Sequence, residues 1–158
     1  MDQMTGQCAC GQVAYRLKRK PIIVHCCHCT WCQRETGSAF VINLMIESAQ
    51  VETTRGACEK ILTPSESGRG QQIWRCPNCK VALWSNYGGP RDVVRFVRAG
   101  TLDQAREIVP DIHIFTRSKV PWLTLPPGAL AFEEYYDVPK VWPAKSLERW
   151  KAAMAGAT

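Results

Sequence analysis

The sequence lacks any apolar run approaching the 18 or more residues of a membrane-spanning helix. Stretches such as residues 39–46 are far shorter, and Asn43 interrupts this one. The first residues, Met-Asp-Gln-Met-Thr-Gly, contain no basic segment followed by an apolar one, so we expect no secretory leader. Nine cysteines among 158 residues, about 6%, are odd in number and fall below the 8–10% of a disulfide scaffold. We therefore expect no membrane segment and a cytoplasmic, reducing location, where clustered cysteines serve metal or redox chemistry.

Neither sign of charge strongly dominates, because 20 lysines and arginines face 14 acidic residues, for a formal charge of +6. The basic residues are scattered apart from one short run at residues 16–20, which we interpret as a solvated strand end. They do not line a helix, and no known nucleic-acid-binding motif is present. This pattern does not favour a nucleic-acid partner. The length fits one domain, residues 1–158, with a core that needs no covalent staples.

Short β-branched and aromatic runs dominate the chain. Residues 11–17 alternate Val13, Tyr15 and Leu17 with polar residues, the period of a half-buried strand. Further strands are predicted at residues 22–24, 40–46, 60–63, 72–75, 81–84, 93–98 and 112–115. Turn sequences separate them, at residues 65–70, 88–90 and 110–111. Many short strands at close spacing predict a mainly β, antiparallel domain.

One helix is predicted after Pro143, because Leu147, Trp150 and Met154 recur at helical spacing and Gly156 follows as a stop. Its apolar stripe should pack on the sheet. The preceding residues 120–142 contain four prolines and predict an irregular strap over the surface of the domain.

Seven cysteines fall into groups at the spacing of metal ligands: Cys8 and Cys10; Cys27, Cys29 and Cys32; Cys76 and Cys79. A structural zinc site closes with four protein ligands, whereas a catalytic one keeps three and an open position. Seven thiols match one site of each kind. Residues 8, 10, 76 and 79 would form the closed site, and residues 27, 29 and 32 would form the open site. A ribbon-like site that joins residues 29 and 32 to residues 76 and 79 is the alternative. It would span 43 residues, against roughly 15–20 in a zinc ribbon.

The remaining cysteines and two histidines receive plainer interpretations. Cys58 is isolated and predicted to be a small core residue. Cys26 should point to the opposite face of an extended segment from Cys27. His28 stands between two predicted ligands and is expected to support the site or face solvent. His113 fits a structural histidine or a pocket wall equally well.

The chain resembles the glutathione-dependent formaldehyde-activating enzyme family, also called the centromere protein V/formaldehyde-activating domain. The matching stretches are residues 6–15 (GQCACGQVAY), 25–40 (HCCHCTWCQRETGSAF), 76–79 (CPNC), 99–103 (AGTLD) and 113–115 (HIF) ahead of Trp122. They follow the order of the family from about residue 6 to about residue 123. The resemblance implies an Mss4-like β fold, with a zinc core at residues 6–123 followed by the strap and C-terminal helix at residues 124–158.

The resemblance also implies two zinc ions per chain. Cys8, Cys10, Cys76 and Cys79 match the structural site of the family. The catalytic site is matched by Cys27, Cys29 and Cys32, and we expect Arg34, Gly37 and Ser38 to contact the substrate. Two positions depart from the common pattern: Lys80 replaces a glycine, and Gln33 replaces a basic residue.

The expected activity is that of a carbon–sulfur lyase, which forms or cleaves S-hydroxymethylglutathione or a related thiol adduct. Zinc held by three thiolates is a weak Lewis acid for water, and a thiol such as that of glutathione suits its open position better. Two alternatives remain: a non-catalytic zinc module that contacts nucleic acid or protein, and a redox protein that uses Cys76 and Cys79. The βαβ context of a thioredoxin-type site is absent from the sequence.

Overall fold

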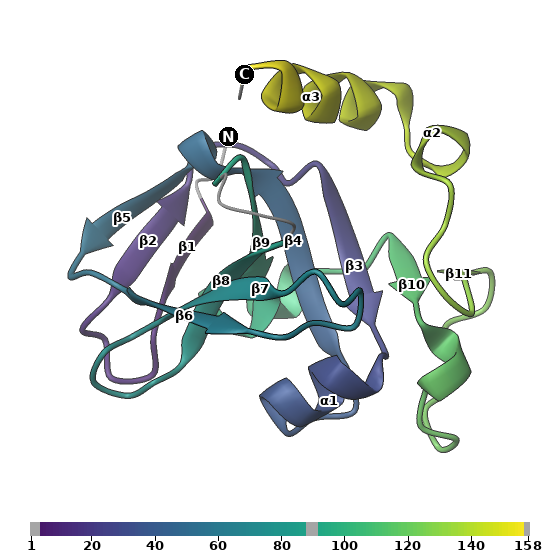
Figure 1. Ribbon diagram of the computed structural model, residues 1–158, viewed down its shortest axis with the longest axis horizontal. Helices are drawn as coiled ribbons and strands as arrows, with labels where there is room; N and C mark the ends of the chain where they lie inside the picture. Colours follow the sequence, from purple (N-terminus) through teal and green to yellow (C-terminus); the bar gives the residue numbers. More distant parts are fainter. Residues whose placement is uncertain (1–3, 88–91, 157–158) are drawn as a thin grey trace.

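The computed structural model describes residues 4–87 and 92–156, in which two β-sheets face each other (Figure 1). The smaller sheet has the order β1-β2-β5, formed by Met4–Gln7, Ala14–Leu17 and Val51–Arg55. The larger sheet has the order β11-β10-β3-β4-β9-β8-β7-β6. Its strands are Leu130–Ala131, Ile112–Ile114, Ile23–Cys27, Val41–Glu47, Val94–Arg98, Ala82–Tyr87, Gln71–Arg75 and Glu59–Thr63. The prediction of a mainly β, antiparallel fold with a C-terminal helix is confirmed.

In the larger sheet, neighbouring strands pair antiparallel along the series β3-β4-β9-β8-β7-β6. The exception is β10, which runs parallel to both β3 and β11. The parallel edge arises because the chain returns to β3 after a long excursion through β4 to β9. This register places His113 beside Cys26 and Ile114 beside Cys27. A segment near residue 113 is thereby brought to the cysteine-rich strand.

Alternation along β3 and β4 divides the core into two clusters, because successive side chains of a strand point to opposite faces. Leu44 and Ile46 face the small sheet, where they join Tyr15 and Trp84. Residues that include Ile23 and Met45 face the other side and pack with Ile112 and Trp142. Each face of this central pair of strands is therefore anchored by its own set of buried side chains.

The predicted C-terminal helix is α3, Ala144–Ala155, with Gly156 at its C-terminal cap. It crosses one end of the sheet (Figure 1) and packs through Trp150, whose ring lies 6.0 Å from that of Trp142. Met154, predicted to share this face, is 44% exposed because the helix extends past the sheet. The Arg149 guanidinium donates to both carboxylate oxygens of Glu47, at 2.9 and 2.6 Å, and fastens α3 to the end of β4.

Several elements were not predicted. They are β1, β5, β11, the helices α1 (Thr30–Thr36) and α2 (Val138–Val141), and the 3-10 turns at residues 48–50, 99–101, 105–107 and 116–118. β11 and α2 lie within the strap, which is therefore less irregular than expected. The predicted turn at residues 88–90 lies outside the described residues. No helix within residues 4–87 and 92–156 combines the length and apolar character of a membrane span.

Candidate metal centres

Cys8, Cys10, Cys76 and Cys79 come together although 66 positions separate the second from the third. Two similar turns carry them, one after β1 and one between β7 and β8. In each, a backbone N–H returns to the first cysteine: Gly11 donates to the carbonyl of Cys8 and Lys80 to that of Cys76, both at 3.0 Å. The four sulfur atoms lie within 4.8 Å of one another. The predicted grouping of these four cysteines matches the structure.

The geometry of this cluster fits a zinc ion. Zn–S bonds of about 2.3 Å in a tetrahedron place sulfur atoms about 3.8 Å apart. The Sγ atoms of Cys8 and Cys10 are 3.6 Å apart, and those of Cys10 and Cys76 are 3.7 Å apart. These distances are far longer than the 2.05 Å of a disulfide. The set of four thiols therefore has the spacing of a closed tetrahedral site.

Lys80, the departure from the family glycine, has a backbone φ of 62°. This left-handed conformation is the one that favours glycine, and a side chain there is strained. The turn still forms, since the N–H of Cys76 donates to Val81 at 3.0 Å and the Lys80 ammonium reaches Glu59 at 2.8 Å. The lysine therefore adopts a backbone conformation that glycine takes without strain.

The second cluster, formed by Cys27, Cys29 and Cys32, lies where β3 ends and α1 begins. Cys29 caps the helix, and its sulfur accepts a hydrogen bond from the N–H of Cys32 at 3.3 Å. All three residues are buried, and their sulfur atoms lie within 4.8 Å of one another. Three soft donors so placed fit a zinc ion with one coordination position left for another ligand.

Hydrogen bonds among the three thiols shift their pKa values in opposite directions. Hydrogen bonds from Cys27 and Cys32 lower the pKa of Cys29 to about 3. The same contacts with Cys29 and Cys32, together with burial, raise the pKa of Cys27 well above its usual range. These contacts favour ionisation of Cys29 over that of Cys27.

Arg98 supplies a positive charge to this region, and sequence reasoning missed it. The side chain is buried on β9, its Nη1 donates to Oδ1 of Asn43, and its Nε has no hydrogen-bond partner. No acidic side chain of the described residues forms an ion pair with it. A hydrogen bond with Cys27 and, more weakly, the charge of Arg98 lower the pKa of Cys32, but contacts with Cys29 and burial raise it above its usual value. A buried cation without an acidic partner is costly unless negative charge lies nearby, and an ionised thiol of this cluster would supply it.

A cavity of about 350 Å³ opens directly onto the three thiols. Aromatic and aliphatic side chains make up most of its wall: Trp31, Tyr87, Phe96, Ile114, Phe115 and Tyr135. Polar groups come from His25, Asn43 and the loop between β6 and β7, which includes Glu66 and Arg69. The volume and the mix of apolar wall and few polar groups are typical of a small-molecule site. Sequence patterns gave no signal for this wall, because it combines five separate segments.

The three predicted substrate residues lie on another part of the surface. Arg34 belongs to the last turn of α1, Gly37 caps it with φ 64°, and Ser38 follows; all three are exposed, and none lines the cavity. Their contact with a substrate stays a prediction.

Gln33 donates its amide to the carbonyls of His28 and Ser118, each at 2.8 Å, and so ties α1 to the segment after β10.

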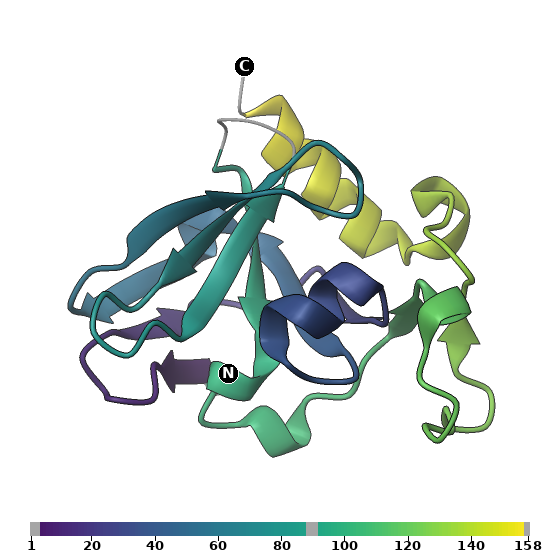
Figure 2. The same ribbon diagram turned by 60° about the horizontal axis from the view of Figure 1, so that its bottom comes forward.

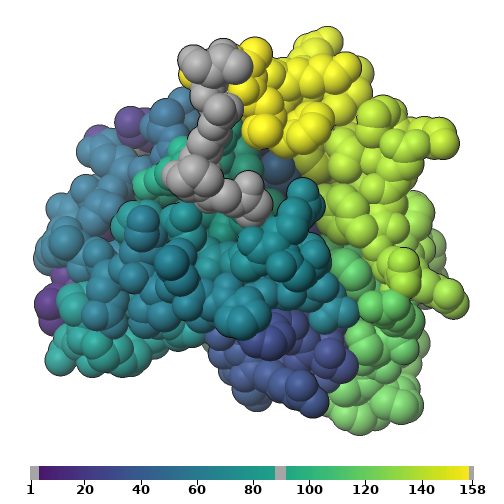
Figure 3. Space-filling view, in the orientation of Figure 1, coloured from purple at the N-terminus to yellow at the C-terminus, as the bar shows by residue number. Residues whose placement is uncertain are grey.

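The helix α1 is also fixed to the first cluster. Glu35 pairs with Arg75, the residue before Cys76. Figure 2 shows α1 at the front of the molecule, and in Figure 3 it lies at the surface between the region around β6 and β7 and the segment that follows β10. This ion pair therefore links α1, which carries Cys32, to the end of β7, which leads into Cys76.

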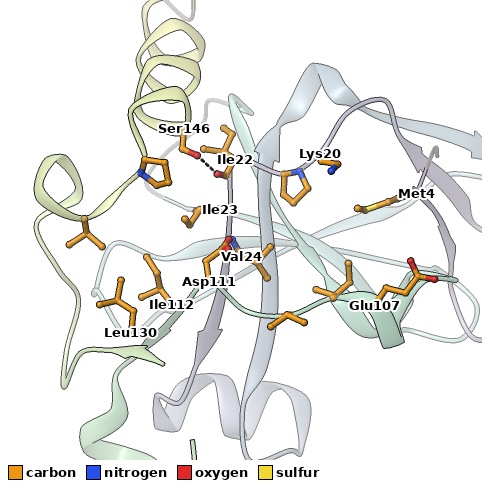
Figure 4. Close-up of a pocket in the computed structure, with 15 residues that line it drawn as sticks. Met4, Lys20, Ile22, Ile23, Val24, Glu107, Asp111, Ile112, Leu130 and Ser146 are labelled. Atoms are coloured by element: carbon orange, nitrogen blue, oxygen red, sulfur yellow. Dashed lines mark hydrogen bonds between the residues drawn. The ribbon is translucent and has the colours of Figure 1, made fainter. Parts of the chain in front are cut away.

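A larger cavity of about 520 Å³ lies elsewhere, between β3, the segment before β10 and the start of α3 (Figure 4). Its lining includes Ile22, Val24 and Ser146, whose hydroxyl donates to the carbonyl of Ile22 at 2.6 Å. No cysteine or histidine of the described residues lines it. It therefore lacks the cysteine thiols that distinguish the smaller cavity.

Cys26, Cys58, His28 and His113 lie outside the two cysteine clusters. Cys58 is half-buried and packs against the core, as predicted. Cys26 lies with His28 and His113, apart from Cys27. His28 is fully buried and does not face solvent.

The sequence of this chain is similar to one known protein family. Residues 3–118 match the family described as glutathione-dependent formaldehyde-activating enzyme. A crystal structure of a Rhodobacter sphaeroides protein is 19% identical, with a TM-score of 0.47 over 63% of this chain and 88% of that one. No curated protein matches. Because the family match covers well over half of the sequence, the chain belongs to the glutathione-dependent formaldehyde-activating enzyme family.

Proposed function

We propose that the protein is a zinc-dependent carbon–sulfur lyase that forms or cleaves a thiol adduct of the S-hydroxymethylglutathione type. The observation that carries the proposal is the cluster of Cys27, Cys29 and Cys32 on the wall of a small-molecule cavity. The four-cysteine cluster, by contrast, has the ligand number of a closed structural site. Membership in the family supports the same class of reaction.

The three cysteines would hold one zinc ion, and Cys8, Cys10, Cys76 and Cys79 would hold another. Zinc bound by three thiolates supplies an open position that favours a soft thiolate ligand and lowers the pKa of a thiol there. Zn²⁺ and three thiolates carry a formal charge of −1. Arg98 offsets this charge from within the core, which reduces the cost of burying the centre.

The other residues of the cavity would position the substrate. The apolar wall excludes water and confines the thiol and the aldehyde, while Arg69 is the cationic side chain among the described lining residues and can pair with a substrate carboxylate. In the forming direction the thiol loses its proton, its sulfur bonds to the carbonyl carbon, and the carbonyl oxygen gains a proton. Burial lowers the pKa of His25 to about 4, so at neutral pH this lining residue is uncharged.

The addition of a thiol to formaldehyde proceeds without a catalyst, so the test must measure exchange at equilibrium. We would follow interconversion of glutathione, formaldehyde and their adduct by NMR exchange spectroscopy with the zinc-loaded protein. Acceleration is expected, and Cys29→Ser should reduce it by more than the roughly 10–100-fold that loss of an outer-shell partner costs. Cys58→Ser, a change outside both clusters, is the matched control. Exchange at the uncatalysed rate with a folded, zinc-loaded protein would refute the proposal.

Arg98 gives a second measurement. Arg98→Met keeps an unbranched side chain but removes the charge, so the three-thiolate cluster should bind zinc more weakly while the four-cysteine cluster is unaffected. We expect at least about a tenfold higher dissociation constant, which corresponds to about 1.4 kcal/mol. Arg98→Lys, which keeps the charge, should recover part of the affinity. Equal affinity in Arg98→Met and the unaltered protein would show that Arg98 has no such role.

The alternative of a non-catalytic module is separated by a different measurement. A protein that neutralises several phosphates loses DNA affinity steeply between low and physiological salt. We expect no such dependence, since bound zinc and deprotonated ligands reduce the formal charge from +6 to about +3.

A further inference from the structure

A third group of metal-type side chains lies on the face of β3 opposite Cys27. It consists of Cys26, His28 and His113, whose ligand atoms lie within 4.8 Å of one another. All three residues are buried, at 2%, 0% and 8% exposure. Neither the lyase reaction nor the two zinc sites proposed above uses any of them.

Strand geometry brings these residues together. Side chains alternate along β3, so Cys26 points away from Cys27, and His28, two positions later, follows the direction of Cys26. His113 is the parallel register partner of Cys26 on β10, so its side chain emerges on the same face. The backbone N–H of His28 donates to the carbonyl of Ile114 at 3.0 Å, which extends the pairing past the end of β3.

The two histidines are held in place. Their rings are stacked with centroids 5.3 Å apart, and Nε2 of His28 lies 3.0 Å from Nδ1 of His113. The carbonyl of His28 accepts hydrogen bonds from Gln33 at 2.8 Å and from Ser118 at 2.9 Å. Nδ1 of His28 is buried without a hydrogen-bond partner. The His28 ring therefore has one hydrogen bond, from Nε2 to the other histidine, and the thiol of Cys26 lies close to both rings.

We propose that Cys26, His28 and His113 form a third metal site, which takes zinc. A thiolate and two imidazoles are ligands that zinc accepts, and no carboxylate of the described residues belongs to the group. Two nitrogens bound to one zinc ion at about 2.0–2.1 Å would lie about 3.3 Å apart in a tetrahedron. The present separation of 3.0 Å is a few tenths of an ångström shorter, a change that small ring rotations supply. Zinc would replace the hydrogen bond between the rings.

The site has a route to solvent. Cys26 and His113 line a cavity of about 480 Å³, whose other walls include Phe40 and residues 123–130 of the strap. A zinc ion with one thiolate and two neutral imidazoles has a formal charge of +1, opposite in sign to the three-thiolate centre. Its fourth ligand would therefore be water or a small anion that enters through this cavity.

Zinc stoichiometry tests the proposal without reference to activity. The protein is equilibrated with excess zinc, passed through a desalting column and measured by elemental analysis. We expect Cys26→Ala and His113→Gln each to bind one zinc ion fewer than the unaltered protein. Cys58→Ala, a change at a cysteine outside all three clusters, should bind the full number. Cobalt substitution gives a second readout, since Cys26→Ala should remove only part of the thiolate-to-cobalt charge-transfer absorption.

A double variant distinguishes the new site from the neighbouring one. Cys32→Ala should empty the three-thiolate site, so Cys26→Ala with Cys32→Ala should lose two zinc ions. Loss of only one in the double variant would mean that Cys26→Ala acts on the site of Cys27, and would overturn the proposal. An unchanged zinc content in both Cys26→Ala and His113→Gln would overturn it equally. Absence of catalysis in the unaltered protein, with three zinc ions bound, would refute the lyase proposal alone.

Discussion

At the scale of residues, the two cysteine clusters carry different consequences for the fold. The four-cysteine cluster joins the turn after β1 to the turn between β7 and β8, and both turns pack against the main core through Cys8 and Cys76. Binding free energies on the order of 10–16 kcal/mol for structural zinc equal or exceed the stability of a typical domain. Loss of one ligand there should therefore affect the whole chain.

We expect Cys79→Ser to unfold the protein or make it insoluble, whereas Cys29→Ser should leave a folded chain with one zinc site impaired. Circular dichroism and expression yield in the soluble fraction measure the difference. Cys29 lies at the end of a short helix, so its loss removes one cap and one ligand but no link between the sheets. If both variants prove equally disruptive, the division into closed and open sites is wrong.

Lys80 provides a second residue-scale prediction, because its φ of 62° penalises any side chain. Lys80→Gly should be more stable than Lys80→Ala by about 1 kcal/mol, the reverse of the usual order of these residues. Both variants lose the exposed ion pair with Glu59, so their difference isolates the backbone effect. Urea denaturation of the two zinc-loaded variants measures it. Greater stability of Lys80→Ala would show that the turn relaxes away from this conformation.

At the scale of elements, α3 depends on the pair of Arg149 and Glu47. Burial alone would raise the pKa of Glu47, but hydrogen bonds from Arg149 and the charges of Arg149 and Arg19 lower it below its usual value. A carboxylate with a depressed pKa contributes stability above about pH 4.3, and this contribution is lost as pH falls through its folded pKa. Acid should therefore loosen α3.

Glu47→Gln should release α3 at neutral pH and cost roughly 1.5–3 kcal/mol, the range for hydrogen bonds to charged groups. Faster amide hydrogen exchange in residues 144–155 measures the release. The variant should also lose the part of the acid dependence that this carboxylate causes. Lys145→Gln, an exposed change on the same helix, is the control and should exchange like the unaltered protein. Unchanged exchange in Glu47→Gln would show that apolar contacts alone hold the helix.

At the scale of the whole molecule, the clusters should differ in how they release zinc. A chelator should remove zinc first from the three-thiolate site, because its open position lets a competing ligand enter. Circular dichroism should remain unchanged during this phase and fall only when the four-cysteine cluster is emptied. Simultaneous loss of all zinc with loss of structure would contradict independent roles for the clusters.

Particular residues show how far the sequence alone reached. Alternation at Val13, Tyr15 and Leu17 predicted a strand, and the helical spacing of Leu147, Trp150 and Met154 predicted α3. Both elements are present. β1 and β5 were missed because Met4–Gln7 and Val51–Arg55 are short and mostly polar, and pairing rather than propensity makes them strands. The spacing of seven cysteines predicted the thiols that share each turn, but it left two ways to combine the pairs, and only the folded chain brings Cys8 and Cys10 to Cys76 and Cys79.

What the sequence by itself determined is local: strand alternation, the C-terminal helix and the ligand spacing within each cysteine group. Tertiary structure decided which distant groups meet. It placed Arg98 in the core near the thiols, assembled the apolar wall of the cavity from five segments, and set His113 beside Cys26 through a parallel register. These contacts join residues tens of positions apart, and their energies depend on burial and pairing in the folded chain. A pattern read along the chain contains neither quantity.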